Sequence, residues 1–176
     1  AKCGKKKVVL ELGGNAAVIV EPDADLDYVA QRCVTGGFSY AGQTCISVQR
    51  IFVQESVAAA FTHHLVARVQ QLATGDPSDE RTVVGPLIDV GAAERVETWI
   101  GEAVAQGARV LSGGSRTGSV VRPTVLSQVT GTMKVSCQEV FGPLVTVTPY
   151  REFEAVLKAV NESDYGLQAG IFTQHI

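Results

Sequence analysis

The sequence lacks the features that mark membrane proteins, secreted proteins and zinc proteins. No apolar run approaches the roughly 20 residues needed to cross a bilayer. Lysines lie near the start, at Lys2 and residues 5–7, but no unbroken apolar segment of a signal peptide follows them. The four cysteines form no Cys-x-x-Cys pair and have no nearby histidine, so the sequence favours no metal site. We therefore expect a cytoplasmic protein with reduced cysteines.

A large excess of charge of one sign is also missing. The formal net charge of the 176 residues is −3, and 19% of them are charged. This balance gives no electrostatic reason to expect binding to nucleic acid or to an anionic membrane. With 45% apolar residues and no repeat, linker or low-complexity segment, the chain is predicted to form one globular domain with a sizeable core.

Predicted strands and helices alternate along the chain, which favours an α/β fold with an open, twisted, mainly parallel sheet flanked by helices. Asp25 is a candidate N-cap, because apolar residues with helical spacing follow it: Leu26, Val29, Ala30, Cys33 and Val34. Gly36 and Gly37 are expected to loosen the end of that helix. Further helices are expected over residues 56–72, 92–106 and 152–161, the second with Val96, Ile100, Ala103 and Val104 facing inward. The expected strands are residues 8–12, 18–20, 50–53, 108–111, 120–126, 144–149 and 169–173.

Glu11 and Cys45 carry most of the chemical information, and they are 45 − 11 = 34 positions apart. A thiol is a strong nucleophile near neutral pH, and a carboxylate within an apolar strand is partly desolvated and so becomes a better base. Gly13 and Gly14 follow Glu11 and allow a backbone or a ligand to approach closely. Such a pair suits the formation of a covalent thioester and its hydrolysis. Taken alone, each residue also fits a structural role, as a buried cysteine or a carboxylate at a strand end.

Three motifs in order carry a resemblance to a known family. Leu-Glu-Leu-Gly-Gly-Asn (10–15) is followed by Tyr-Ala-Gly-Gln-Thr-Cys-Ile-Ser (40–47) and Gln-Glu-Val-Phe-Gly-Pro (138–143). Together they resemble the aldehyde dehydrogenase superfamily. Shorter segments that continue the resemblance are residues 22–25, 85–88, 122–124, 165–167 and 170–173. It thus runs through essentially all of residues 1–176 and implies the catalytic domain of the aldehyde dehydrogenase fold.

The resemblance implies a role for each matching residue. Cys45 attacks the aldehyde to form a thiohemiacetal, which loses hydride to the nicotinamide of NAD or NADP and leaves a thioester; its own backbone N–H helps to stabilise the oxyanion. Glu11 matches the general base that activates water for hydrolysis, which favours release of a free carboxylic acid over transfer to coenzyme A. Glu139 is expected to hold the nicotinamide ribose hydroxyls, Phe141 to pack beside the nicotinamide, and Gly13 to lie near the same end of the cleft.

Parts that the resembled family needs are absent from the chain. It has no Gly-x-Gly-x-x-Gly before a helix, and it lacks the family's upstream oxyanion asparagine and its C-terminal oligomerisation strand. We therefore expect a truncated catalytic domain with little or no dehydrogenase activity by itself, from a homodimeric or homotetrameric protein.

The motifs look most like those of enzymes acting on short polar aldehydes, of the lactaldehyde, glycolaldehyde, succinate semialdehyde or glyceraldehyde 3-phosphate type. Gln43 and Thr44 flank Cys45 and are candidates to shape the substrate pocket. A phosphorylated substrate would need cationic side chains, for which Arg50 and Arg122 are the candidates.

Two alternative interpretations stay open. Cys45 could serve a thioester-forming enzyme or a cysteine esterase that needs no cofactor. Alternatively, the chain could be a structural module without catalysis, although the presence of both Glu11 and Cys45 argues against this. The histidines, His63, His64 and His175, are interpreted as surface residues rather than as bases.

Overall fold

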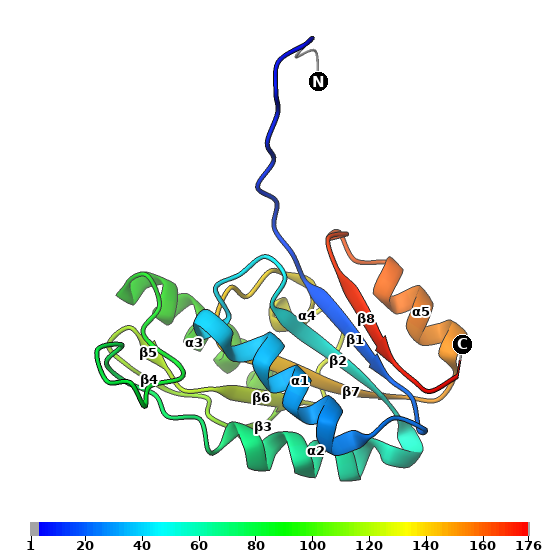
Figure 1. Cartoon of the computed structure of the whole chain (residues 1–176). Helices are drawn as coiled ribbons and strands as arrows, with labels where there is room; N and C mark the ends of the chain where they lie inside the picture. Colours follow the sequence, from blue (N-terminus) through cyan, green and yellow to red (C-terminus); the bar gives the residue numbers. More distant parts are fainter. Residues whose placement is uncertain (1–3, 176) are drawn as a thin grey trace.

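Residues 4–175, which the computed structural model describes, form a six-stranded sheet with helices against both faces and a small hairpin beside it (Figure 1). In chain order the elements are β1 (Ala16–Val20), α1 (Leu26–Phe38), the 3₁₀ helix η1 (Ser39–Gly42), β2 (Val48–Gln54), α2 (Glu55–Val69), α3 (Val90–Ala105), β3 (Arg109–Ser112), β4 (Arg116–Thr117), β5 (Val120–Val121), β6 (Thr124–Ser127), α4 (Lys134–Cys137), β7 (Leu144–Tyr150), α5 (Phe153–Asn161) and β8 (Ala169–Phe172). The strand order is β3-β6-β7-β2-β1-β8, and every neighbouring pair except β3 and β6 is parallel. The predicted α/β class with a mainly parallel sheet is confirmed.

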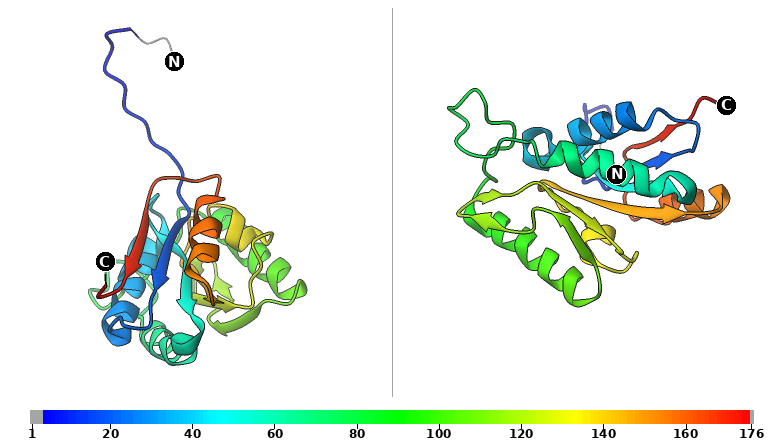
Figure 2. Two further views of the ribbon diagram at one scale, coloured as in Figure 1. Left: turned by 90° about the vertical axis from the view of Figure 1, so that its right-hand side faces the viewer. Right: turned by 90° about the horizontal axis from the view of Figure 1, so that it is seen from below.

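The core lies on both faces of the central strands. β1 is buried at all five positions, as expected for a parallel strand covered on both sides. Helices α1 and α2 lie on one face, and α3, α4 and α5 on the other (Figure 2). Side chains from both layers join one large apolar cluster that includes Phe61, Leu65, Val96 and Leu126. No helix within residues 4–175 is long and apolar enough to cross a membrane.

Helix α1 begins where the sequence predicted, because the Asp25 carboxylate accepts the N–H groups of Asp27 and Tyr28. The helix ends at Phe38, so Gly36 and Gly37 lie within its last turn, close to the end where they were expected. A Cβ added to Gly37 would lie 2.5 Å from Cγ1 of Val145 on β7. The glycine therefore permits close packing of the helix on the sheet.

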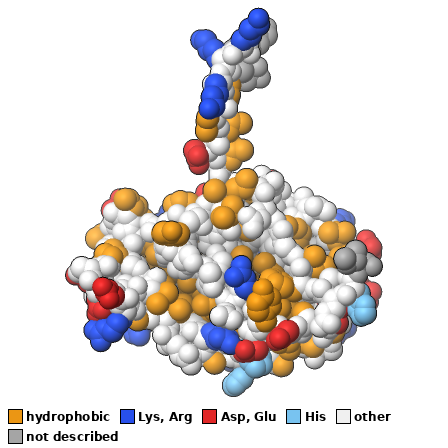
Figure 3. Space-filling model, in the orientation of Figure 1, with side chains coloured by type: hydrophobic (Ala, Val, Ile, Leu, Met, Phe, Trp, Pro, Cys, Tyr) orange, Lys and Arg blue, Asp and Glu red, His pale blue; other side chains and the backbone are white. Residues whose placement is uncertain are grey.

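The strand predicted over residues 8–12 is wrong. This segment is an extended arm that leaves the body of the molecule, and Figure 3 shows its apolar side chains standing clear, with lysines farther out. Val9 and Leu10 are 74% and 71% exposed. A strand needs a neighbour for its backbone hydrogen bonds, whereas β2 and β8 meet the chain only from Ala16 and Ala17 onward.

Two other boundaries differ from expectation. The strand predicted over residues 120–126 is two strands, β5 and β6, because Pro123 between them has no N–H to donate to a ladder. β5 pairs with β4, whereas β6 joins the main sheet. On α3, Val96, Ile100 and Ala103 are buried as predicted, but Val104 is 45% exposed and Ala93 takes its place in the core.

The packing of α1 can be tested with two glycine substitutions in helices. Gly37→Ala is expected to destabilise the protein by about 1–3 kcal/mol, since the new Cβ overpacks against β7. Gly101→Ala in α3 is the matched control: its Cβ would have nothing within 4 Å, so the gain in helix propensity should stabilise by up to about 1 kcal/mol. Thermal denaturation followed by circular dichroism measures both. A Gly37→Ala protein as stable as the wild type would contradict the close packing.

Candidate functional site

Three segments that carry chemically informative residues meet at one edge of the sheet. Gly14 lies just before β1, Cys45 just before β2, and residues 139–143 just before β7. These strands are neighbours in the order β7-β2-β1 and run parallel, so their amino ends lie along the same edge. Residues that are more than 100 positions apart in the sequence are thereby brought into contact.

Glycines allow the three segments to touch through their backbones. A Cβ added to Gly14 would lie 1.7 Å from the carbonyl oxygen of Cys45. A Cβ on Gly42, whose φ is +70°, would lie 2.1 Å from the carbonyl oxygen of Gly142. Any side chain at either position would push the segments apart, so the contact between them requires glycine.

Cys45 lies in a turn between η1 and β2, where its free thiol is partly buried. The N–H of Ser47 donates to the carbonyl of Thr44 and closes the turn at 3.1 Å. Within residues 4–175 the N–H of Cys45 has no hydrogen-bond partner. It is therefore free to donate to an oxyanion that forms on a substrate attacked by the thiol.

The backbone leading into this turn is strained. Tyr40 and Ala41 have φ values of +53° and +56°, in the left-handed region that non-glycine residues rarely adopt. Phe141, in the third segment, has a φ of +47°. Each such residue costs on the order of 1–3 kcal/mol, and they tend to collect at functional sites, where the surrounding structure holds them in place.

Glu139 joins the third segment to the first. Its Oε1 accepts the N–H of Gly14 at 2.7 Å, and its backbone N–H donates to the hydroxyl of Tyr165 at 3.2 Å. Gly13 lies beside the same carboxylate, since a Cβ there would be 2.9 Å from Oε2. The ring of Phe141, two residues farther on, is 41% exposed. The structure thus brings Gly13, Cys45, Glu139 and Phe141 into one site.

Glu11 stands apart from that site. It is exposed on the arm, and its carboxylate makes no hydrogen bond or ion pair within residues 4–175. The desolvation expected for it is not found, because residues 8–12 form no strand. The arm joins the body of the molecule at Gly14, which packs against the backbone of Cys45. Glu11 is three residues before Gly14, and three extended residues span at most about 11 Å. A bend in the arm would therefore bring Glu11 within reach of Cys45.

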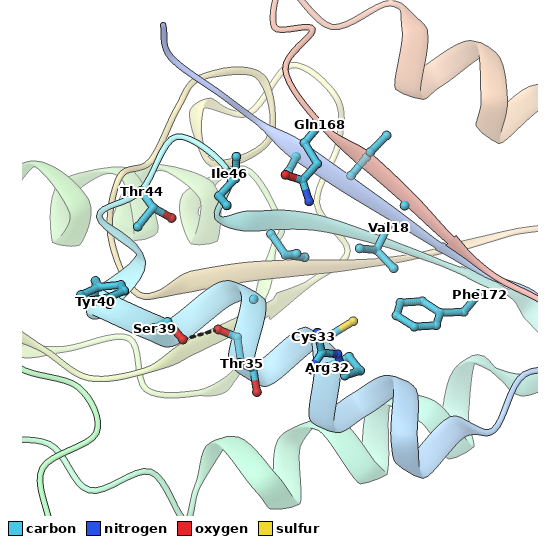
Figure 4. Close-up of a pocket in the computed structure, with 16 residues that line it drawn as sticks. Val18, Arg32, Cys33, Thr35, Ser39, Tyr40, Thr44, Ile46, Gln168 and Phe172 are labelled. Atoms are coloured by element: carbon cyan, nitrogen blue, oxygen red, sulfur yellow. Dashed lines mark hydrogen bonds between the residues drawn. The ribbon is translucent and has the colours of Figure 1, made fainter. Parts of the chain in front are cut away.

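Two hollows flank the Cys45 turn. One has a volume of about 860 Å³ and lies between the turn and residues 77–88. The other, of about 360 Å³, lies between α1, β1 and β8, with Val18, Cys33, Ile46 and Gln168 on its walls (Figure 4). Both hollows are lined by Tyr40 and Thr44, so the Cys45 turn separates the two hollows.

Gln43 and Phe141 line the larger hollow. The side chain of Gln43 also ties the turn to the neighbouring loop, because its Oε1 accepts the N–H of Ile88 at 2.9 Å. Gln43 and Thr44, proposed from the sequence to shape the substrate pocket, both face cavities next to Cys45.

The arginines proposed for a phosphorylated substrate line neither hollow. Arg50 is buried in β2, where its guanidinium donates to the carbonyls of Asn15 and Ala159 at 3.2 and 3.3 Å; burial lowers its pKa because it penalises the charged form. Arg122 lines a separate hollow of about 240 Å³. The basic residue on the wall of the cavity in Figure 4 is instead Arg32.

The remaining candidate residues lie where the sequence suggested. Cys33 is buried in the core, and burial raises the pKa of its thiol to about 12. His63 is exposed, whereas His64 and His175 lie 3.4 and 3.7 Å from surface aspartates. Among the described residues no three His, Cys, Asp or Glu side chains come close enough together to hold a metal ion.

Three side chains that hold the Glu139 loop were not identified from the sequence. They are Asn15, Gln49 and Tyr165, which all form hydrogen bonds with the backbone of residues 135–140. Asn15 and Tyr165 stand at the ends of motifs that carry the resemblance. Gln49 lies in no motif, and nothing in the sequence marks it.

The difference between the buried thiol of Cys33 and the partly buried thiol of Cys45 gives a direct test. At pH 8 iodoacetamide should label Cys45 in the native protein and leave Cys33 unlabelled, because the thiolate reacts and a pKa of about 12 leaves only about one Cys33 in 10⁴ ionised. In guanidinium chloride burial is lost and both should label. Peptide mass spectrometry measures the rates, and equal native rates would contradict the placement of Cys33.

Comparison with known proteins agrees with this site. The sequence matches the profile of the aldehyde dehydrogenase family over residues 1–176. It is 48% identical over 176 residues to 3-sulfolactaldehyde dehydrogenase of Priestia aryabhattai, covering 100% of this chain and 37% of that protein.

Solved structures give the same result. Aldehyde dehydrogenase 21 from Physcomitrella patens, in complex with the reaction product succinate, has a TM-score of 0.93 and 44% identity, covering 98% of this chain and 36% of that one. NADP-dependent glyceraldehyde-3-phosphate dehydrogenase from Bacillus halodurans C-125, complexed with NADP, has a TM-score of 0.90 and 40% identity, covering 93% and 34%. The chain spans little more than a third of the length of these relatives. In sequence, in fold and in the motifs that meet at its site, the chain belongs to the aldehyde dehydrogenase family.

Proposed function

We propose that this chain is the catalytic part of a hydrolytic, NAD(P)-dependent aldehyde dehydrogenase that converts a short polar aldehyde to a carboxylic acid. The observation that carries the proposal is the contact of Gly14, Cys45 and Glu139 at one sheet edge. The relatives support the substrate class, since they include proteins named 3-sulfolactaldehyde, lactaldehyde and succinate-semialdehyde dehydrogenase.

In the proposed reaction the Cys45 thiolate attacks the carbonyl carbon of the aldehyde and forms a thiohemiacetal. The unpartnered N–H of Cys45 donates to the oxyanion. Bound NAD(P)+ would supply the hydride acceptor, and loss of hydride from this carbon would leave a thioester on Cys45. Glu11 then takes a proton from water, the hydroxide attacks the thioester, and the thiolate leaves as the carboxylic acid is released.

Glu139 and Phe141 fit the nicotinamide half of the cofactor. The Oε2 atom of Glu139 accepts no hydrogen bond within the described residues, so it is available to a ribose hydroxyl. Phe141 offers an exposed ring on the wall of the 860 Å³ hollow, where a planar nicotinamide could pack. By elimination, the 360 Å³ hollow on the other side of the turn would take the aldehyde.

The rest of the cofactor would need a binding domain elsewhere in the whole protein. The exposed apolar arm supports this part of the proposal, because Val8, Val9, Leu10 and Leu12 form a patch that a further domain would cover. The same covering would desolvate Glu11 and bend it toward Cys45. We propose that this domain alone has no dehydrogenase activity and that the whole protein is a cytoplasmic homodimer or homotetramer.

The role of the nucleophile is tested in the full-length protein by Cys45→Ser. Aldehyde-dependent NAD(P)H formation, followed at 340 nm across a panel of short aldehydes, should fall by at least about 10³-fold, because a hydroxyl is a far weaker nucleophile than a thiolate. Cys137→Ser is the control and should keep near-wild-type turnover. Undiminished turnover in Cys45→Ser would contradict the covalent mechanism through Cys45.

The role of the base is tested separately by Glu11→Gln. Hydride transfer precedes the step that needs a base, so a rapid burst of NAD(P)H should persist while steady-state turnover falls by about 10²–10⁴-fold. Mass spectrometry should then detect the acyl group on Cys45. Glu80→Gln, on an exposed loop, is the matched control. Loss of the burst together with turnover would contradict a role confined to hydrolysis.

A further inference from the structure

We propose that Gln49 is a positioning residue that fixes the loop carrying Glu139 and Phe141 in the conformation that receives the nicotinamide. This inference rests on the proposed function. Gln49 lies on β2, four residues after Cys45, and is only 4% exposed. Its side chain points not into a hollow but into the segment between α4 and β7.

Both ends of the Gln49 carboxamide are used. Nε2 donates to the carbonyl of Val135 at 2.9 Å and to that of Gln138 at 2.7 Å, and Oε1 accepts the N–H of Val140 at 2.9 Å. These three hydrogen bonds reach the loop on both sides of Glu139. One buried side chain therefore holds the backbone on both sides of Glu139.

A second buried carboxamide, on the residue just before β1, holds the same loop. Asn15, also 4% exposed, donates from Nδ2 to the carbonyl of Ser136 at 2.6 Å and to that of Gln138 at 3.4 Å. The carbonyl of Gln138 thus receives N–H groups from both side chains. Asn15 follows directly after Gly14, whose own N–H donates to Glu139.

The loop depends on these side chains because it has no regular structure of its own. Helix α4 has only four residues, and no helix or strand covers residues 138–143 before β7 begins. Buried backbone groups need hydrogen-bond partners. Here the partners come from Asn15, just before β1, and from Gln49 on β2. Strand β2, which follows Cys45, therefore also positions the loop that carries Glu139 and Phe141.

A small displacement of this loop would matter. Reacting groups must be held close to their productive geometry, and an error of about 1 Å is enough to cost about 10²-fold in rate. Gln49 touches neither Cys45 nor any reacting atom, so its effect is predicted on cofactor binding and not on the reactivity of the thiol.

The first test needs no cofactor. In the full-length protein, Gln49→Met keeps the length of the side chain but removes all three hydrogen bonds, so amide hydrogen exchange at Val140 should become at least about 10-fold faster, or 1.4 kcal/mol. Gln49→Glu keeps an acceptor for the Val140 N–H but turns a buried carboxylate towards the carbonyl oxygens of Val135 and Gln138, so it should also speed exchange at Val140. A cooperative thermal transition shows that each variant is folded.

Thr146→Val is the matched control. Thr146 is 1% exposed, and its hydroxyl donates to the backbone carbonyl of Gln49 at 3.3 Å, with no hydrogen bond to the loop. The substitution removes one buried hydrogen bond from the same part of the sheet. A loss of thermal stability smaller than that of Gln49→Met is expected, with Val140 exchange unchanged.

The second test measures binding of NAD+ and NADP+ by isothermal titration calorimetry, with the rate of Cys45 alkylation as a check on the nucleophile. Gln49→Met should raise the Kd of the preferred cofactor at least about 10-fold, or 1.4 kcal/mol, and leave alkylation within about twofold of the wild type. Thr146→Val should change neither.

A folded Gln49→Met protein with wild-type Val140 exchange and wild-type Kd would overturn the inference. So would weaker binding that Thr146→Val reproduces equally, since a general loss of stability would then explain it. If the wild type bound neither cofactor, the proposed function would be contradicted. The hydrogen-exchange data would still show whether Gln49 holds the loop.

Discussion

The parallel register of β7, β2 and β1 is the constraint on which the site depends. Each of these strands is preceded by a segment with chemical character, and parallel neighbours place their amino ends together. Reversing any one strand would carry its segment to the opposite edge of the sheet. Because β1 is buried at every position, and β2 and β7 at most of theirs, a change of register would disrupt the core as well as the site.

The site itself is made of loops, and the sheet only determines where they begin. Glycines at positions 14 and 42 let the backbones touch, and left-handed residues at positions 40, 41 and 141 bend them. Buried carboxamides just before β1 and on β2 then supply hydrogen bonds that the loops do not make internally. Strained and irregular backbone is kept in one conformation because rigid strands hold it from two sides.

The two residues proposed to carry the reaction, Cys45 and Glu11, differ in how firmly this chain holds them. The nucleophile turn is held by its own hydrogen bonds and by contacts to Gly14 and Ile88. The proposed base, by contrast, is on an arm whose apolar side chains are 52–74% exposed. In the proposed reaction, thiol chemistry would thus depend on contacts within the sheet edge, whereas hydrolysis would depend on how the arm is placed.

Local patterns in the sequence were enough to predict the α/β class, the cap at Asp25, the burial of Cys33 and most strand and helix positions, because caps, periodicity and turn residues act over a few positions. The motifs around Glu11, Cys45 and Glu139 pointed to the family in the same way. Only the tertiary structure decided that residues 8–12 form no strand and leave Glu11 exposed, that α1 runs through Gly36 and Gly37, and that Asn15 and Gln49 hold the Glu139 loop. Each of these depends on which distant backbone lies alongside: a strand needs a partner, a helical glycine is useful only against a neighbouring side chain, and a buried amide bonds whatever carbonyl the fold brings to it.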